Sequence, residues 1–257
     1  MALLDNKVAI ITGGAGGIGS AAARLFVENG CSVMLVDRSS EALEQAVRSI
    51  GGDRIASSTA DVTDPVAVAA YTQATVDQFG GLDIALLNAG ITGPNTLIDD
   101  YPLETFDEVM SINVRGVWLG LKAAIPHIKR RGSGAIVMTS SIQGLAAMPG
   151  TTGYTTSKHA VVGMMKGAAL ELARHNIRVN AINPGFVATP MMDRIHRSSA
   201  PDAPESVEAA LSATVPLRRY ARAEEIARLM LFLASSESAY CTGACYLADG
   251  GTLASFG

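Results

Sequence analysis

The stretch TGGAGGIG, residues 12–19, decides the fold expected for this chain. An apolar run at residues 7–12 predicts a strand before it, and the pattern of residues 18–29 predicts a helix after it. Glycine lets the backbone approach a phosphate closely, and the N–H groups at a helix N-terminus bind one. A glycine-rich turn alone also fits an ordinary tight turn. Its place between strand and helix predicts a dinucleotide site, with contacts from Gly13, Gly14, Gly17, Ile18 and Gly19.

Outward from this turn, strand-like and helix-like patterns alternate. Apolar runs that predict strands lie at residues 7–12, 32–37, 55–61, 82–88, 135–140, 177–183 and 244–248. Helical patterns lie at residues 18–29, 39–50, 102–131, 154–175 and 223–235, and a further helix, capped by Asp64, begins at Pro65 and stops at Gly80. Pro126 is expected to kink the helix of residues 102–131. We expect an α/β, Rossmann-like, doubly wound parallel sheet of about seven strands with helices on both faces.

No linker divides the sequence, so residues 1–257 are expected to form a single dinucleotide-binding catalytic domain. The long stretch Phe186 to Pro216 is rich in Ser, Ala and Pro and is expected to be irregular. It follows the end of a predicted parallel strand, where ligands bind in such folds. A substrate lid is the favoured interpretation, and a surface excursion without a role is the alternative.

Composition narrows the class of protein. Hydrophobic residues make up 48% and charged residues 17%, which favours a buried globular core. The net charge of -4, without a basic block, argues against nucleic acid as a partner. No apolar run approaches the ~20 residues that span a bilayer, and the start MALLDNKVAII does not resemble a secretory signal. We expect a cytoplasmic protein without a membrane partner.

Cysteine and histidine spacing predicts no metal site. Cys241 and Cys245 are four residues apart but lack a second pair or nearby histidines. Three cysteines provide no disulfide framework. The four histidines are scattered, at positions 127, 159, 175 and 196.

Asp37 predicts which cofactor is bound. It ends the second predicted strand, eighteen residues after Gly19. A carboxylate there accepts hydrogen bonds from the ribose hydroxyls of adenosine and repels a 2′-phosphate. Arg38 could instead hold such a phosphate, but Asp37 ends the strand and is expected to point at the ribose. We therefore expect NAD, with a plain helix-entry turn as the alternative role of Asp37.

Further motifs resemble the short-chain dehydrogenase/reductase family nearly from end to end. They are the glycine turn, Asp61-Val62, Asn88-Ala89-Gly90, Asn183-Pro184-Gly185 with Thr189, and Asp249-Gly250-Gly251. Leu87 departs from the family, which usually has a second Asn there. The resemblance implies adenine contacts from Asp61 and Val62, further cofactor contacts from Asn88, Ala89 and Gly90, and a nicotinamide site at Pro184, Gly185, Val187 and Thr189.

Tyr154 and Lys158 are the candidate acid–base pair. They are four residues apart near the start of a predicted helix, so they share one face. A free Tyr has a pKa of about 10, and a Lys cation beside it favours the phenolate and lowers that pKa. Tyr154 is then suited to take a proton from an alcohol as hydride leaves carbon. Without other motifs, such a pair is more often a surface pair.

The resemblance implies two further catalytic residues and a cofactor role for the same pair. Ser141, thirteen residues before Tyr154, would hold the substrate oxygen. Asn113 would support a water chain for proton relay through Lys158. Tyr154 and Lys158 would also contact the cofactor. The implied reaction is hydride transfer between NAD and a secondary alcohol or ketone.

The predicted substrate-facing residues follow the fifth and sixth strands or lie in the lid. Most are apolar, which favours a hydrophobic, cyclic or aromatic substrate, although ordinary core packing is an equal alternative for each. Gln143 is the polar group among them suited to fix orientation. With Ser141, the set is Gln143, Leu145, Ala146, Met148, Phe186, Met191 and Met192.

Wide apolar arcs on the helices at residues 111–131 and 154–175 predict burial against another subunit. Trp118, Leu121, Met164 and Met165 cannot all face one sheet. The family resemblance implies a homotetramer. Two other functions stay open. One is an NADP-dependent 3-oxoacyl-thioester reductase, which Asp37 disfavours, and the other is a non-catalytic nucleotide sensor, which would not need Ser141, Tyr154 and Lys158.

Overall fold

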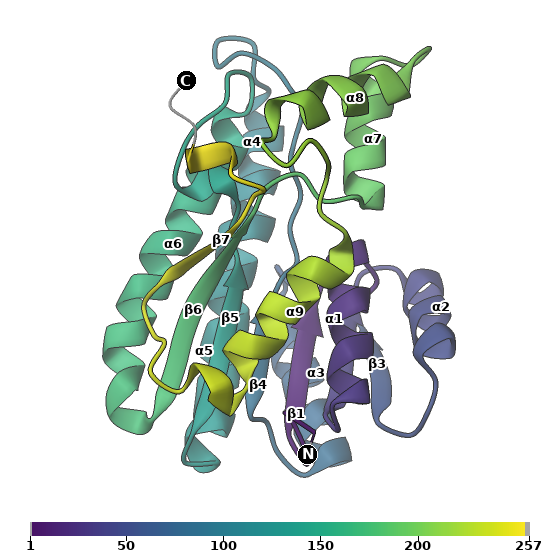
Figure 1. The fold of residues 1–257 in the computed structure, drawn as a ribbon. Coiled ribbons are helices and arrows are strands. Elements are labelled where there is room, and N and C mark those ends of the chain that lie inside the picture. The colour runs from purple at the N-terminus through teal and green to yellow at the C-terminus, as the bar shows by residue number, and fades with distance from the viewer. Residues whose placement is uncertain (1, 255–257) are drawn as a thin grey trace.

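A computed structural model describes residues 2–254 of the chain. One parallel seven-stranded sheet runs through it in the order β3-β2-β1-β4-β5-β6-β7 (Figure 1). The strands are β1 (Val8–Thr12), β2 (Ser32–Asp37), β3 (Ile55–Thr59), β4 (Ile84–Leu87), β5 (Gly134–Thr139), β6 (Ile177–Pro184) and β7 (Cys245–Ala248). The predicted doubly wound α/β fold is confirmed.

Helices cover both faces of this sheet, because alternate residues of each buried strand point to opposite faces. In β1, Ala9 and Ile11 belong to one core and Ile10 to the other. The first core is closed by α1 (Gly17–Glu28), α2 (Ser40–Ile50) and α9 (Ala223–Ala234). The second is closed by α3 (Pro65–Phe79), α5 (Val117–Arg130) and α6 (Thr152–Leu172).

Local signals set the ends of α3 as predicted. The Asp64 carboxylate accepts a hydrogen bond from the Val66 N–H at 2.8 Å, and Pro65 is the first helical residue. Gly80 ends the helix in the left-handed conformation, at φ 80°, which glycine adopts without a steric penalty. Capping chemistry readable in the sequence therefore fixes this element.

The helix predicted at residues 102–131 differs from the expectation. It consists of α4 (Leu103–Met110), a π-helical segment (Ser111–Gly116) and α5, and α5 continues through Pro126 to Arg130. The departure from α-helical geometry thus begins at Ser111, fifteen residues before Pro126, in the segment that carries the buried Asn113. Such π segments are frequent at functional sites.

The segment expected to be irregular is partly helical. Residues 186–216 contain α7 (Pro190–Ser199) and α8 (Pro204–Thr214), each with proline in its first turn. Proline tolerates this position because the first N–H groups of a helix have no intrahelical acceptor. Figure 1 shows both helices at the end of the molecule toward which β1 runs.

Parallel pairing brings the carboxyl ends of the central strands to one edge. The register pairs Ile11 with Leu86, Leu87 with Met138, and Thr139 with Ile182. Residues that follow β1, β4, β5 and β6 therefore meet at this edge, where ligands bind in open parallel sheets.

Candidate active site

The glycine turn between β1 and α1 leaves no room for side chains at Gly14, Gly17 and Gly19. Gly13 has φ +64°, and a Cβ on Gly19 would lie 2.2 Å from the Gly13 carbonyl oxygen. A Cβ on Gly17 would lie 2.9 Å from the Thr189 side chain. The turn thus exposes backbone N–H groups at the start of α1, which suits an anionic pyrophosphate.

Asp37 lies against this turn. Its Oδ2 accepts a hydrogen bond from the Ala15 N–H at 3.2 Å, and its Oδ1 lies 3.4 Å from the Ser39 backbone nitrogen. The carboxylate is half-buried, whereas Arg38 beside it is exposed. Asp37 therefore both supports the turn and carries negative charge at its rim.

Asn88 joins three strand ends. Its Nδ2 donates to the Thr12 carbonyl oxygen at 3.1 Å, and its Oδ1 accepts from the Thr139 hydroxyl at 3.0 Å. The Thr12 hydroxyl in turn accepts from the backbone N–H groups of Asn88 and Ala89. The side-chain amide of Asn88 is thus engaged within the protein. The structural roles of Thr12 and Thr139 were not predicted, because threonine in a strand carries no distinguishing pattern.

The other predicted cofactor residues lie at the same edge. Val62 packs against Gly116 so closely that a Cβ on Gly116 would lie 2.8 Å from the Val62 Cγ2. Gly185 follows β6 and lies against the carboxy-terminal motif, since a Cβ on Gly185 would lie 2.9 Å from the Asp249 Cα. Pro184 and Val187 are buried, and Asp61 is exposed and accepts from the Thr63 hydroxyl at 2.8 Å.

Lys158 is buried beside Tyr154. Its Nζ lies 5.5 Å from the centre of the Tyr154 ring and donates to the Thr139 carbonyl oxygen at 2.9 Å. Gly90 leaves space for it, since a Cβ there would lie 3.2 Å from the Nζ. Burial lowers the pKa of Lys158 to about 8, because a low-dielectric environment disfavours the charged form.

Tyr154 differs from the expectation in the direction of its pKa shift. Burial raises the pKa of its phenol, and a hydrogen bond with the Ser141 side chain acts to lower it. The expected lowering by Lys158 is not seen, and desolvation of the phenolate is the largest effect on the Tyr154 pKa. Within the chain alone, Tyr154 is therefore an acid that holds its proton.

Ser141 follows β5 and is buried. Its Oγ accepts from the Gln143 N–H at 3.2 Å, and its carbonyl oxygen accepts from Asn183 Nδ2 at 2.7 Å. These bonds hold the Ser141 backbone between β5 and β6. The Ser141 hydroxyl and the Tyr154 phenol thus lie together at the same edge of the sheet.

Asn113 connects the loop after β4 to α6. Its Oδ1 accepts from the Ile91 N–H at 2.8 Å, and its Nδ2 donates to the Ile91 carbonyl oxygen and, at 2.9 Å, to the Ser157 hydroxyl. Asn113 is fully buried. Ser157, next to Lys158, was not predicted, and a small polar residue inside a helix offers no sequence signal for such a role.

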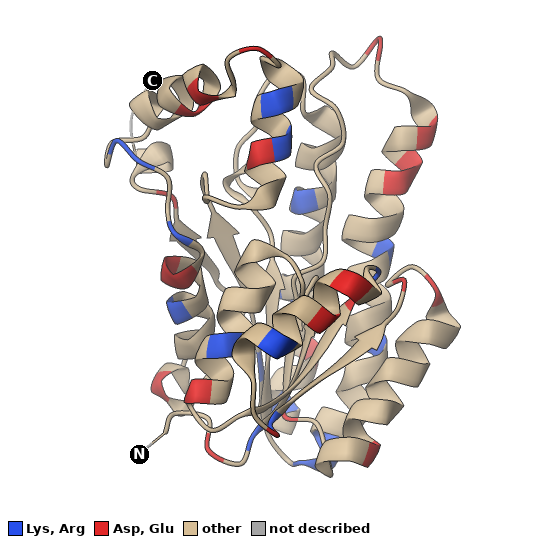
Figure 2. Cartoon of the chain, turned by 90° about the vertical axis from the view of Figure 1, so that its right-hand side faces the viewer, with Lys and Arg blue, Asp and Glu red and all other residues tan. Residues whose placement is uncertain are grey.

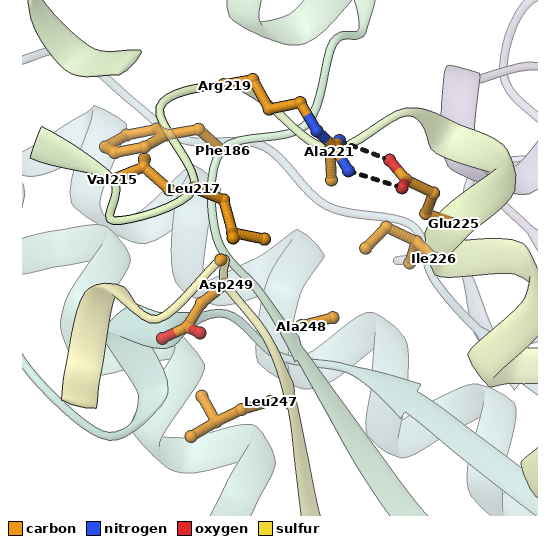
Figure 3. Close-up of a pocket in the computed structure, with 11 residues that line it drawn as sticks. Phe186, Val215, Leu217, Arg219, Ala221, Glu225, Ile226, Leu247, Ala248 and Asp249 are labelled. Carbon is orange, nitrogen blue, oxygen red and sulfur yellow. Dashed lines mark hydrogen bonds and ion pairs between the residues drawn. The ribbon is translucent and has the colours of Figure 1, made fainter. Parts of the chain in front are cut away.

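The predicted substrate residues divide into two groups. Figure 3 shows Phe186 at a cavity of about 270 Å³ that also involves Leu217, Leu247 and the Arg219–Glu225 ion pair. Neither Tyr154 nor Gln143 lines this cavity. Gln143 and Met148 instead contact each other near Ser141, and Met191 and Met192 are half-buried in α7.

The apolar residues predicted for subunit contact differ in their exposure to solvent. Leu121 and Met165 are buried in the core beneath the sheet, whereas Trp118 is 54% exposed. Trp118, Met110, Val114 and Met164 line an apolar surface cavity of about 420 Å³.

Figure 2 shows acidic and basic residues interspersed over the face in view. Within residues 2–254, no group of three or more His, Cys, Asp or Glu side chains is arranged to hold a metal ion. No helix of this described part is long and apolar enough to cross a bilayer.

Comparison with known proteins finds similarity over the whole chain. A family model described as "Enoyl-(Acyl carrier protein) reductase" matches residues 13–252. The chain is 42% identical over 255 residues to "Oxidoreductase UcpA" of Salmonella typhimurium, covering 98% of this chain and 96% of that protein. It is 39% identical over 251 residues to "2-(R)-hydroxypropyl-CoM dehydrogenase" of Xanthobacter autotrophicus, covering 95% and 98%. The solved structure of levodione reductase superimposes with a TM-score of 0.95 at 35% identity, covering 98% of this chain and 100% of that one.

Proposed function

Because the chain belongs to the short-chain dehydrogenase/reductase family, we propose that it transfers a hydride between NAD and a secondary alcohol or ketone. The observation that carries this proposal is the meeting of Ser141, Tyr154 and Lys158 at the edge where the glycine turn opens. A general acid, a hydroxyl and a buried ammonium at this edge suit proton transfer to or from a substrate oxygen. The family relation and the strand-end geometry support the same assignment.

The residues present fit a nicotinamide dinucleotide. A Cβ on Gly17 would clash with Thr189, and one on Gly19 would clash with the Gly13 carbonyl oxygen, so glycine lets the turn fold tightly at the start of α1. No side chain of residues 2–254 caps that helix end, which leaves its first N–H groups for an anionic pyrophosphate. Thr189 beside Gly17, Pro184 at the end of β6 and Gly185 after it would hold the nicotinamide end. When bound, the cofactor supplies the hydride acceptor or donor and a positive charge on its oxidised ring.

The chain's own residues would handle the proton. In alcohol oxidation, Tyr154 Oη accepts the hydroxyl proton, and the Ser141 hydroxyl holds the substrate oxygen by a hydrogen bond. Lys158 stabilises the Tyr154 phenolate that this step requires. Because burial raises the pKa of Tyr154 in the chain alone, a further positive charge beside the phenol is needed to make it a base near neutrality. Asn113 holds the Ile91 backbone against α6 beside Ser157, the neighbour of Lys158. Its proposed role is to support a water relay to Lys158.

NAD is the proposed cofactor because of Asp37. Its half-buried carboxylate at the rim of the turn would accept hydrogen bonds from the ribose hydroxyls and repel a 2′-phosphate. The Arg38 side chain, which could hold such a phosphate, is exposed.

The competing function is the NADP-dependent reduction of a 3-oxoacyl thioester, because the chain is 37% identical over 250 residues to "3-oxoacyl-[acyl-carrier-protein] reductase FabG" of Thermotoga maritima. An acidic segment disfavours it. The residues Asp99, Asp100, Glu104, Asp107 and Glu108 are all exposed. The loop before them is tied to the loop before α6 by the Thr96 N–H, which donates to the Gly150 carbonyl oxygen at 2.8 Å. These carboxylates would repel a thioester carried on a phosphate-bearing arm.

We further propose an apolar cyclic or aromatic substrate, closed over by α7 and α8 as a lid, and a homotetrameric assembly. The half-buried methionines Met191 and Met192 of α7 suit an irregular apolar ligand. The exposed Trp118 and the apolar cavity around it favour a subunit contact.

A panel of secondary alcohols with NAD, followed as NADH formation, tests the activity. Tyr154→Phe is expected to lower kcat about a hundredfold to ten-thousandfold, since acid–base catalysis supplies about 10²–10⁴. Tyr240→Phe is the matched control, because the Tyr240 side chain is fully exposed. Full turnover by Tyr154→Phe would contradict the assignment of the base, and binding of NAD without turnover of any alcohol or ketone would favour the nucleotide sensor.

A further inference from the structure

Gln143 is the polar side chain closest in sequence to Ser141 on the predicted substrate wall, and its amide is held in one orientation. Its Oε1 lies 2.6 Å from the Thr151 Oγ1 and 2.8 Å from the Thr155 Oγ1, and both hydroxyls donate to it. Thr155 is the neighbour of Tyr154. The Gln143 backbone N–H meanwhile donates to the Ser141 hydroxyl oxygen at 3.2 Å. The Gln143 backbone is therefore bonded to Ser141, and its side chain is bonded to the residue next to Tyr154.

The Thr155 bond favours the amide orientation in which the nitrogen is free, because the Thr155 hydroxyl proton then has an acceptor. The Thr151 hydroxyl also lies 2.9 Å from the Met148 carbonyl oxygen, so its single proton has two acceptors. Within residues 2–254, the Thr155 hydroxyl has no hydrogen-bond partner other than Gln143. Reversing the amide would turn its oxygen toward the Met148 sulfur, which has no proton to donate.

The Gln143 Nε2 is left with little to bind. Its one acceptor in the described part of the chain is the Met148 Sδ at 3.5 Å, and a thioether sulfur is a weak acceptor. An amide nitrogen carries two protons, so at least one is available. Gln143 is half-buried, and the neighbouring chain positions Leu145, Ala146 and Met148 are apolar.

We propose that Gln143 Nε2 recognises a second oxygen of the substrate, in addition to the oxygen that Ser141 and Tyr154 bind. The inference rests on the proposed function and narrows it. The substrate is a ketone or secondary alcohol, largely apolar, that carries a further acceptor oxygen such as a carbonyl or an ether. Thr155 is the positioning residue, because its hydroxyl holds the amide with the donor outward.

The test compares cyclohexanone with ring ketones of the same size that carry a second acceptor oxygen, namely tetrahydropyran-4-one, tetrahydropyran-3-one and cyclohexane-1,4-dione. Each variant is compared with the wild type on the same ketone, so that differences in intrinsic reactivity cancel. Gln143→Leu keeps the side-chain volume and removes the donor. We expect it to lower kcat/KM about tenfold on at least one of the oxygen-bearing ketones, mainly through KM, and to leave cyclohexanone unchanged.

Thr155→Val is the second variant, because it removes one hydroxyl and retains Gln143. It should cause a smaller loss in the same direction, and no additional loss when combined with Gln143→Leu. Thr156→Val is the matched control, since Thr156 is the exposed neighbour on the same helix. Thermal unfolding of each variant shows whether it retains the fold, and Thr155→Val carries the test if Gln143→Leu does not fold.

The outcomes separate this inference from the proposed function. Equal losses on cyclohexanone and on the oxygen-bearing ketones would assign Gln143 a structural role and overturn the inference, as would no loss on any ketone. Both results leave the proposed oxidoreductase activity standing. Failure of the wild type to reduce any ketone with NADH or NADPH would instead overturn the proposed function, and the inference with it.

Discussion

At the scale of single residues, the site combines groups whose chemistry is set by burial. Tyr154 holds its proton more firmly than a free phenol, and Lys158 holds its proton less firmly than a free amine. Both shifts follow from the cost of placing a charge in a low-dielectric environment. Near neutrality Tyr154 is therefore uncharged, whereas Lys158, with a pKa of about 8, is still largely protonated. The phenol becomes a base only when a further positive charge is brought to the site.

Lys158 should make stability depend on pH. Its pKa is about 8 in the folded chain and about 10.4 when unfolded. Between these values the unfolded chain binds one more proton, so the free energy of unfolding rises with pH in this window. Urea unfolding at pH 8 and pH 10 should show a smaller rise in Lys158→Met than in the wild type. Lys122→Met, at an exposed position, should keep the wild-type rise, and an equal rise in Lys158→Met would refute the shift.

Asp37 should control the choice of cofactor. Asp37→Asn keeps an oxygen for the Ala15 N–H and removes the charge. We expect the ratio of kcat/KM with NAD to that with NADP to fall about tenfold or more, because a charge repulsion of at least about 1.4 kcal/mol is removed. Asp53→Asn, at an exposed position, serves as the control. A wild type that turns over only with NADP would show that the role assigned to Asp37 is wrong.

At the scale of elements, the best-predicted helix is the one whose ends carry their own signals. The Asp64 cap, Pro65 and Gly80 bound α3 as expected. The chain from Leu103 to Arg130 lacks such internal signals, and its π-helical segment was not predicted. That segment turns Asn113 toward Ile91 and Ser157, contacts between residues 22 and 44 positions apart.

Removing the Asp64 cap should weaken α3. In Asp64→Ala, the Val66 N–H loses its acceptor, and we expect the free energy of unfolding to fall by about 1 kcal/mol. Urea denaturation measures this change. Asp53→Ala, which removes an exposed carboxylate outside any helix, should change stability by less than about 0.5 kcal/mol. Equal effects of the two substitutions would argue against the cap.

At the scale of the whole molecule, one sheet edge collects the functional residues and one helical face is left apolar. The carboxyl ends of β1, β4, β5 and β6 meet through parallel pairing. On α5, Leu121 points into the core and Trp118 points outward beside Met164. The same helix therefore packs into the core on one side and presents an exposed apolar side chain on the other, where we propose the subunit contact.

Trp118→Glu should reduce the size of the assembly. A carboxylate in an apolar subunit contact would be buried without a partner, which is costly. We expect light scattering coupled to size exclusion to give a tetramer for the wild type and a smaller species for the variant. Val66→Glu places a carboxylate at another exposed apolar residue, 75% exposed on α3, and should leave the size unchanged. A monomeric wild type would contradict the proposed assembly.

The sequence by itself determined the class of fold, the glycine turn and the candidate acid–base residues. These depend on local periodicity, on glycine where a Cβ would clash, and on short spacings within one helix. Only the tertiary structure decided the helices of residues 190–214, the π-helical segment and the pKa directions of Tyr154 and Lys158. It also decided the hold of Thr151 and Thr155 on Gln143. Burial and contacts between distant segments exist only once the sheet has formed, so no local pattern of residues encodes them.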